Sequence, residues 1–198
     1  MHDGAIQSLF GIDMKLEAIR REPSALGPGV DDELAQVQGL LRHEVLSLRE
    51  LMQALRPIEL DSSEQVPDVL ASLVERFRRD TGISARFVVG EGRIALRPGR
   101  ALELVRLVQE ALVNVRKHSR AKNVLVRLAP SGDACALVVE DDGCGFDFEG
   151  RLTGGELDAR RLGPTIIKER VRQLGAELSI DSTPDGGARI EVHVPQDL

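Results

Sequence analysis

The stretches QEALVNVRKHS, residues 109–119, and VEDDGCGFD, residues 139–147, decide how this sequence is interpreted. Glu110 and Asn114 are four residues apart, so they share one face of a helix, and Lys117 with His118 extends that polar stripe. Apolar residues cover the opposite side: Leu104, Leu107, Val108, Ala111, Leu112 and Val115. A carboxylate, a carboxamide and cations on one helix face can bind Mg²⁺ through oxygen and a triphosphate through nitrogen.

Each stretch alone has an ordinary interpretation. A charged stripe is usually the solvated face of a helix, and Asp-Gly and Gly-Phe pairs mark ordinary turns. Their order favours a binding site, because the helix is followed by two strand-like runs, 123–128 and 134–140, and then directly by the glycine loop. This order and these residues resemble the nucleotide-binding domain shared by sensor histidine kinases, gyrase, Hsp90 and MutL.

The resemblance implies how adenine would be bound. Asp141 would accept a hydrogen bond from the exocyclic amine of adenine, and guanine presents an acceptor at the same place, so the carboxylate selects ATP over GTP. Gly143 and Gly145 would let the backbone turn and approach the base without a side-chain clash.

The resemblance also implies how the phosphates would be bound. Asn114 would be a magnesium ligand, and Glu110 would act through a metal-bound or attacking water. Lys117 and His118 would lie near the phosphates. We therefore expect ATP and Mg²⁺ as cofactors, with Asn114 and Glu110 as the metal-binding residues.

The first 60 residues predict two helices joined by a short loop. The breaker stretch PSALGPG, residues 23–29, separates two runs with a helical period, and Pro57 ends the second. The first run carries Ile6, Leu9, Phe10, Leu16 and Ile19, and the second carries Leu34, Val37, Leu41, Val45, Leu48, Met52 and Leu55. One hairpin has too little surface to bury both apolar stripes, so we expect a homodimeric four-helix bundle. A hairpin packed on its own domain is the alternative.

His2-Asp3-x-x-x-Gln7, the hairpin, and LRPIEL at 55–60 resemble the dimerisation and phosphoacceptor domain of one sensor histidine kinase subfamily. Its members usually pass phosphate to response regulators with helix-turn-helix output domains. The resemblance implies that His2 is the phosphoacceptor, since neutral imidazole is nucleophilic near pH 7. Asp3 would orient the ring and take up or stabilise its proton, and Gln7 would position water for dephosphorylation of the regulator. The family carries a sensor or signalling helix before this point, so we expect a piece of a longer protein.

Two positions depart from the family pattern. The second glycine box normally reads Gly-x-Gly, and here Arg161 replaces the first glycine while Gly163 keeps the second. Pro164 suits the first turn of the helix predicted over 165–174, whose N-terminus would face the triphosphate. Ala188 stands where the family commonly has a threonine whose hydroxyl helps to hold adenine through water. These departures predict weaker nucleotide binding or an altered lid.

Composition limits the classes of protein. The 198 residues carry a net charge of −6 and no Trp or Tyr, which disfavours nucleic-acid binding. There is no apolar run of membrane-spanning length and no secretory signal, so we expect no direct membrane contact of this fragment. Cys135 and Cys144 lack metal-ligand spacing and suggest reduced thiols. We expect a cytoplasmic location, with the parent protein soluble or attached to a membrane.

The predicted fold class is α+β: the helical hairpin, residues 1–60, is followed by a two-layer α/β sandwich, residues 61–198. In the second domain we expect three helices on one face of a mixed sheet. The helices span 66–80, 98–117 and 165–174, the strands span 83–89, 123–128, 134–140, 177–181 and 188–194, and a glycine-rich lid spans 146–162. The linker near 57–67 would act as a hinge.

The sequence thus predicts the catalytic core of a bacterial sensor histidine kinase. It would use Mg-ATP to phosphorylate His2 and then pass the phosphate to an aspartate on the receiver domain of a response regulator. Three alternatives stay open: a nucleotide-binding regulator or phosphatase-biased pseudokinase, a hydrolase-type member of the same ATPase superfamily that uses Glu110 to activate water, and a dimerisation module without catalysis.

Overall fold

The chain divides into two compact units, residues 1–57 and 58–198. The structure is a computed structural model that describes residues 65–197 and, in the first unit, five helical residues: Leu16, Leu34, Val37, Gln38 and Leu41. Val37 is 51% exposed in the single chain, whereas the neighbouring Gln38 is buried. The remainder of the predicted hairpin, with His2, Asp3, Gln7 and His43, lies outside the described residues.

A six-stranded mixed sheet with the strand order β1-β2-β3-β6-β5-β4 forms the centre of the second unit. Its strands are β1 (Ser84–Val89), β2 (Asn123–Ser131), β3 (Ala134–Asp141), β4 (Gly150–Thr153), β5 (Glu177–Thr183) and β6 (Gly187–Pro195). Only the pairing of β1 with β2 is parallel, and the other four pairings of this sheet are antiparallel. Because β3 pairs with β6, residues 142–186 form an excursion between two neighbouring strands.

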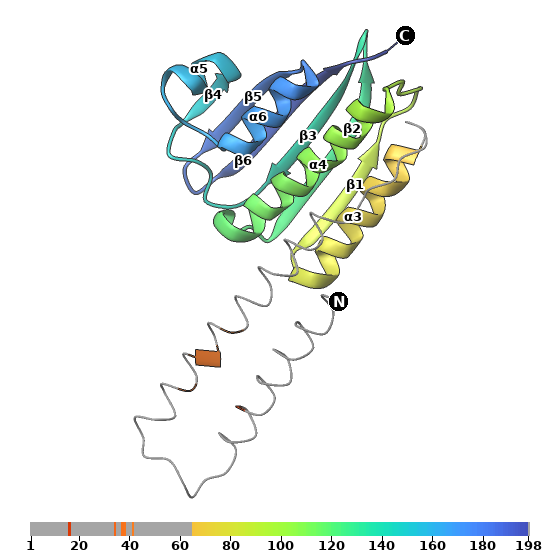
Figure 1. Cartoon of the computed structure of the whole chain (residues 1–198). Helices are drawn as coiled ribbons and strands as arrows, with labels where there is room; N and C mark the ends of the chain where they lie inside the picture. Colours follow the sequence, from red (N-terminus) through yellow and green to blue (C-terminus); the bar gives the residue numbers. More distant parts are fainter. Residues whose placement is uncertain (1–15, 17–33, 35–36, 39–40, 42–64, 198) are drawn as a thin grey trace, which may run out of the picture. The chain divides into compact units, whose positions relative to one another are not determined.

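Three helices cover one face of this sheet, as Figure 1 shows: α3 (Val66–Thr81), α4 (Pro98–Asn114) and α6 (Thr165–Leu174). Proline stands in the first turn of both α3 and α4, where its missing N–H would have no intrahelical acceptor. Gly82 and Gly175 end α3 and α6 in the left-handed conformation that glycine adopts without strain. The predicted two-layer arrangement, and with it the α+β fold class, is confirmed.

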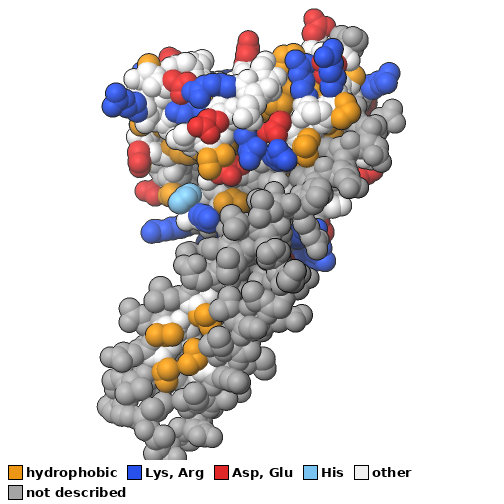
Figure 2. Space-filling model, in the orientation of Figure 1, with side chains coloured by type: hydrophobic (Ala, Val, Ile, Leu, Met, Phe, Trp, Pro, Cys, Tyr) orange, Lys and Arg blue, Asp and Glu red, His pale blue; other side chains and the backbone are white. Residues whose placement is uncertain are grey.

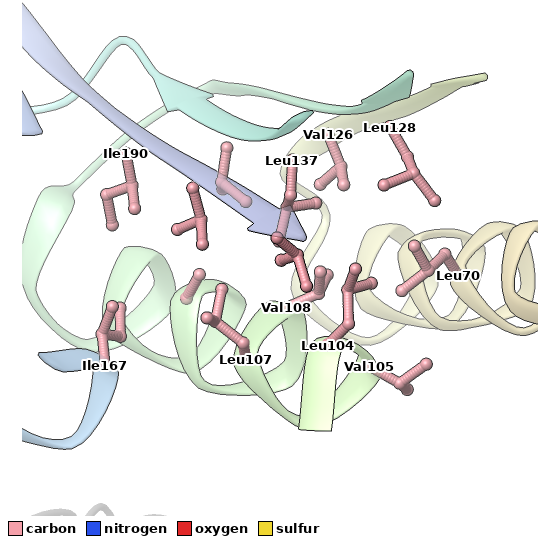
Figure 3. Packing of buried hydrophobic residues seen from close by; sticks show 14 of the residues in the cluster. Leu70, Leu104, Val105, Leu107, Val108, Val126, Leu128, Leu137, Ile167 and Ile190 are labelled. Atoms are coloured by element: carbon pink, nitrogen blue, oxygen red, sulfur yellow. The ribbon is translucent and has the colours of Figure 1, made fainter. Parts of the chain in front are cut away.

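The core lies between this helical layer and the sheet. Leu104, Leu107 and Val108 of α4 are fully buried and point toward the sheet, where they meet residues such as Val126 and Leu137 (Figure 3). Alternate strand residues contribute the other half of the core, which gives each strand one buried and one open face. Burial of α4 along its whole length fixes the helix that carries the predicted phosphate-binding stripe.

The structure differs from the sequence prediction within the expected lid. Residues 150–159 form the edge strand β4 and the short helix α5 (Gly154–Ala159), neither of which was predicted within the glycine-rich lid. The Thr153 side chain accepts a hydrogen bond from Glu156 N, and the Glu156 carboxylate accepts one from Thr153 N, so a capping box starts this helix. The lid predicted over 146–162 is therefore partly regular structure.

The long helix predicted over 98–117 ends at Asn114 as an α-helix. It continues as a π-helix, η2 (Val115–Ser119), whose wider turn follows the predicted magnesium ligand directly. π-Helical turns within or beside α-helices are rare and occur frequently at functional sites. The polar stripe therefore crosses a change in helical geometry between Asn114 and Lys117.

The surface of the second unit mixes charges of both signs. On the face shown in Figure 2, basic and acidic side chains of the described residues alternate without gathering into a patch of one sign. On the open side of the sheet, the His193 side chain is 37% exposed, and its Nε2 lies 3.1 Å from Glu191 Oε1. Among the described residues there is no helix with the length and apolar character needed to cross a membrane.

Candidate ATP-binding site

Helix α4 presents the two predicted metal-binding residues side by side. Glu110 and Asn114 are both half-buried and lie one turn apart. The Asn114 Nδ2 atom is buried and makes no hydrogen bond within the described structure. A buried amide nitrogen without a partner is costly unless a ligand or water pairs with it. This orphaned group fits a site that is completed by a polar ligand.

Helix η2 joins this stripe to the glycine loop. The Cys144 N–H donates a 2.7 Å hydrogen bond to the Ser119 carbonyl, and the Cys144 thiol donates to the His118 carbonyl at 3.1 Å. Lys117 and His118 project from the same turn and are exposed. The two stretches that were predicted to form one site are thus in direct contact, through the main chain and thiol of Cys144 and the carbonyl oxygens of His118 and Ser119.

Gly143 is required by this contact. A Cβ at position 143 would lie 2.2 Å from the Ser119 carbonyl oxygen and 2.6 Å from Ser119 Cβ. The sequence prediction explained this glycine by close approach to the adenine base. The structure supplies a different reason within the protein, because a side chain would push the loop away from η2.

Asp141 and Asp142, at the end of β3, differ in burial and in their hydrogen-bond partners. Burial raises the pKa of the Asp141 carboxyl above its ordinary value, although this carboxylate accepts a 2.9 Å hydrogen bond from Gly143 N. The exposed Asp142 carboxylate binds the backbone N–H groups of Lys122 and Asn123 and the Asn123 side chain, and these hydrogen bonds lower its pKa. Asp142 therefore fastens the loop to β2, while Asp141 stays half-buried at the predicted adenine position.

The turn between β5 and β6 closes the other side of the loop. The hydroxyl of the buried Ser182 accepts a 2.8 Å hydrogen bond from Phe146 N, and Asp185 N donates to the Cys144 carbonyl at 2.9 Å. Gly145 has a φ of +73°, and a Cβ there would lie 2.6 Å from the Thr183 carbonyl oxygen. A Cβ at Gly187 would meet the Asp141 carbonyl oxygen at 2.1 Å. Backbone contacts on two sides therefore hold the glycine loop.

Ala188 lies between two polar residues of the site. It pairs with Asp141 of β3 on one side and with Ser182 of β5 on the other, so the three side chains form one row on the same face of the sheet. The central member of this row has no hydroxyl, as the sequence indicated. Ser182 and Asp142 were not predicted as site residues. The Ser-Thr pair before the glycine turn and the doubled aspartate were the signals that could have indicated them.

The second glycine segment lies between α5 and α6. Arg161 and Gly163 both adopt left-handed backbone conformations, with φ of +57° and +74°. A Cβ at Gly163 would lie 3.3 Å from Leu157 Cδ2, so this glycine packs against α5. No described contact joins Gly163 to Asp141 or Asn114. Arg161 has a left-handed backbone, which glycine adopts more readily, and its side chain is exposed.

The residues present fit a magnesium–nucleotide site of the kind that relies on substrate oxygens. Among residues 65–197 there is no cluster of three or more His, Cys, Asp or Glu side chains that could hold a metal alone. Mg²⁺ in nucleotide sites is usually held by one or two protein ligands together with phosphates and waters. The pair of Glu110 and Asn114 matches that requirement.

A cavity of about 590 Å³ lies elsewhere, between β4, α5, α6 and the start of β5. Its lining includes Arg151, Asp158, Lys168 and Arg172 and none of the residues predicted to bind ATP. The candidate nucleotide site is therefore defined by the contacts of the two sequence motifs and not by this cavity.

Comparisons with known proteins show the family to which the chain belongs. Residues 99–198 match the family model described as histidine kinase-, DNA gyrase B- and HSP90-like ATPase, and residues 1–60 match a model described as histidine kinase. The ATP-binding domain of PrrB from Mycobacterium tuberculosis has a similar fold, with a TM-score of 0.53 and 20% identity over 67% of this chain and 95% of that chain. The histidine kinase domain of the Erythrobacter litoralis EL346 blue-light activated kinase gives a TM-score of 0.51 at 18% identity over 96% of this chain and 94% of that chain.

Relatives in sequence extend over nearly the whole chain. A Chloroflexus aurantiacus protein named as an uncharacterised sensor-like histidine kinase is 32% identical, and the histidine-protein kinase/phosphatase DegS of Brevibacillus brevis is 30% identical, each over 98% of this chain. The sensor protein VraS of Staphylococcus aureus is 28% identical over the same share. The chain spans 33%, 49% and 53% of the lengths of these three proteins. It belongs to the histidine kinase-, DNA gyrase B- and HSP90-like ATPase family, and its first 60 residues match the histidine kinase model.

Proposed function

We propose that this chain binds Mg-ATP between α4, η2 and the glycine loop and transfers the γ-phosphoryl group to His2. The observation that carries the proposal is the direct contact of the glycine loop, through Gly143 and Cys144, with the end of the helix that bears Glu110 and Asn114. That contact links the loop that follows the proposed adenine ligand Asp141 to the end of the helix that bears the proposed phosphate-binding residues, which supports a shared site.

Each residue has a proposed role in binding. Asp141 accepts a hydrogen bond from the adenine amine, and Gly145 shapes the loop around the base. Asn114 and Glu110 hold Mg²⁺, which would offset the negative charge of the phosphates. Lys117 and His118, both exposed on η2, interact with the phosphate oxygens. Gly163 and the N-terminus of α6 cover the phosphates.

The transfer is an in-line displacement. A neutral ring nitrogen of His2 attacks the γ-phosphorus, the bond to the bridging oxygen breaks, and ADP leaves. Asp3 accepts or stabilises the proton of the other ring nitrogen. An aspartate on the receiver domain of a response regulator then takes the phosphoryl group, and Gln7 positions water for its later removal.

The domain arrangement is part of the proposal. Residues 1–60 form the dimerising phosphotransfer hairpin, residues 61–198 bind ATP, and the linker near 57–67 lets one move against the other. The boundary between the compact units at residues 57 and 58 supports this division. The half-exposed Val37, which belongs to the predicted apolar stripe, supports a homodimer that covers it. A cytoplasmic location completes the proposal.

Incubation with γ-labelled ATP and Mg²⁺ tests this function, with the full chain and its His2→Ala variant compared side by side. We expect acid-labile, alkali-stable label on the wild type and none on the variant. ATP turnover that survives His2→Ala without phosphohistidine would instead identify a hydrolase-type ATPase. Failure of the wild type to bind ATP would refute the proposed site.

A phosphatase-biased pseudokinase is the second candidate. Two observations favour it: Arg161 occupies a glycine position in the second glycine segment, and the row Asp141–Ala188–Ser182 lacks its central hydroxyl. This candidate predicts measurable ATP binding, no phosphohistidine, and Gln7-dependent loss of phosphate from a phosphorylated receiver domain.

A further inference from the structure

Helix α5 is attached to the rest of the unit at few points. Leu157 is fully buried, and its carbonyl accepts a 2.8 Å hydrogen bond from Leu162 N. Leu157 is the only buried residue of α5, and four of the other five residues of this helix are exposed. Because the helix has only six residues, its position depends on these contacts and not on its own stability.

Asp158 of α5 forms ion pairs with two cations of α6. Its Oδ1 lies 3.0 Å from Lys168 Nζ, and its Oδ2 accepts a 2.6 Å hydrogen bond from Arg172. Hydrogen bonds from Arg172 and Lys168 lower the pKa of Asp158 below its ordinary value. The two helices are therefore held together by charge.

Lys168 extends this link to the second glycine segment. Its side chain is only 10% exposed, and Nζ also donates a 2.9 Å hydrogen bond to the Leu162 carbonyl. Leu162 lies between Arg161 and Gly163, the two residues with left-handed backbone. A single ammonium group thus contacts both α5 and the middle of the segment proposed to cover the phosphates.

The surroundings of this link leave space for movement. The cavity of about 590 Å³ is lined by Asp158, Lys168 and Arg172 together with residues of β4 and β5. Dense packing does not back α5 on this side. The left-handed backbone of Arg161 is also unfavourable for a residue with a side chain, so it persists only where neighbouring contacts impose it.

From these observations we infer that Lys168 and Asp158 are positioning residues for ATP binding. They hold the Arg160–Pro164 segment, with Arg161 and Gly163 in the left-handed conformation, before the nucleotide arrives, and Lys168 acts through the Leu162 carbonyl without touching ATP. The inference rests on the proposed function in one respect, that this segment covers the phosphates.

Hydrogen exchange on the nucleotide-free full chain tests the positioning directly. Lys168→Met and Asp158→Asn should each speed amide exchange in peptides that cover residues 157–164 by roughly tenfold, since loss of a charge-assisted hydrogen bond opens the segment locally. Exchange in β2 and β3 should not change. Lys168→Arg, which keeps a positive charge at this position, should keep the amides of residues 157–164 protected from exchange. Glu75→Gln, which removes an exposed ion pair with Arg78 of comparable length, is the matched control and should leave residues 157–164 unaffected.

ATP binding supplies the second readout. Lys168→Met and Asp158→Asn should raise the KM for ATP about three- to tenfold with a smaller change in kcat. In these variants part of the free energy of ATP binding is needed to order residues 160–164, so the apparent affinity falls. Unchanged exchange in both variants, or faster exchange throughout residues 65–197, would overturn the inference. A wild type that binds no ATP would refute the proposed function, and the exchange data would still decide the positioning role.

Discussion

Replacing Gly143 by alanine tests whether the glycine loop must lie against the end of η2. A Cβ at this position would lie 2.2 Å from the Ser119 carbonyl oxygen. Ordinary carbon contacts are about 3.5–4.0 Å, so the loop would have to move by roughly 1 Å or more. That movement would break the 2.7 Å hydrogen bond from Cys144 N to Ser119 O. The φ of Gly143 is not in the left-handed region, so the effect of alanine would come from this collision alone.

The magnitude follows from the two contacts that change. Overpacking a tight site costs about 1–3 kcal/mol, and a lost backbone hydrogen bond costs about 0.5–1.5 kcal/mol. We therefore expect Gly143→Ala to lower the free energy of unfolding of this unit by about 2–4 kcal/mol. ATP affinity should fall at least about tenfold, because the loop that follows Asp141 would no longer lie against helix η2.

Urea unfolding followed by far-UV circular dichroism measures the stability, since the chain has no Trp or Tyr for fluorescence. Isothermal titration measures ATP binding. Gly99→Ala is the matched control: its Cβ would meet nothing within 4 Å, and alanine within α4 should leave stability unchanged or raise it by up to about 1 kcal/mol. If Gly143→Ala unfolds within about 0.5 kcal/mol of the wild type and binds ATP normally, the proposed packing of the loop is wrong.

Two further predictions concern titratable groups. Because burial raises the pKa of Asp141, its ionised form lowers the stability of the folded protein above that pKa. Asp141→Asn should therefore maintain or raise the urea midpoint at pH 7. The difference in midpoint between variant and wild type should vanish as the pH falls through the pKa of Asp141. ATP affinity should drop by about ten- to a hundredfold, and a variant less stable than the wild type would contradict this explanation. Burial also raises the pKa of the Cys135 thiol to about 11, so its thiolate fraction at pH 8 is about one in a thousand. Iodoacetamide should label the half-buried Cys144 of the folded chain and spare Cys135 until urea is added, and equal labelling by mass spectrometry would refute the burial of Cys135.

Periodicity was sufficient to predict the longer helices and strands of the second unit. The helix expected over 66–80 is observed as Val66–Thr81. The two strands expected over 123–128 and 134–140 are observed as β2 and β3, which extend to Ser131 and Asp141. Each of these elements buries a continuous apolar stripe or a strand face, and such patterns are visible in a single sequence. The same reasoning yields the two-layer arrangement.

Short elements and long-range contacts were beyond that reasoning. β4 has four residues and buries one of them, Leu152, so it has no period to recognise. The Thr153-x-x-Glu156 capping signature of α5 was present in the sequence and was not used. The π-helix after Asn114 has no local signal. The contact of Gly143 with Ser119 joins residues that are 24 positions apart, so only the folded chain shows why that glycine is needed.

The manner in which the glycine loop is held has a consequence for chemical inhibition. Gly143, Gly145 and Gly187 are each confined by carbonyl oxygens of the main chain, at Ser119, Thr183 and Asp141 respectively. No substitution can remove a carbonyl oxygen, and any side chain added at these three glycines would displace the loop. A compound that binds by fitting the shape of this loop would therefore be hard to evade by substitution at these three glycines, because each substitution would also disturb the proposed nucleotide site.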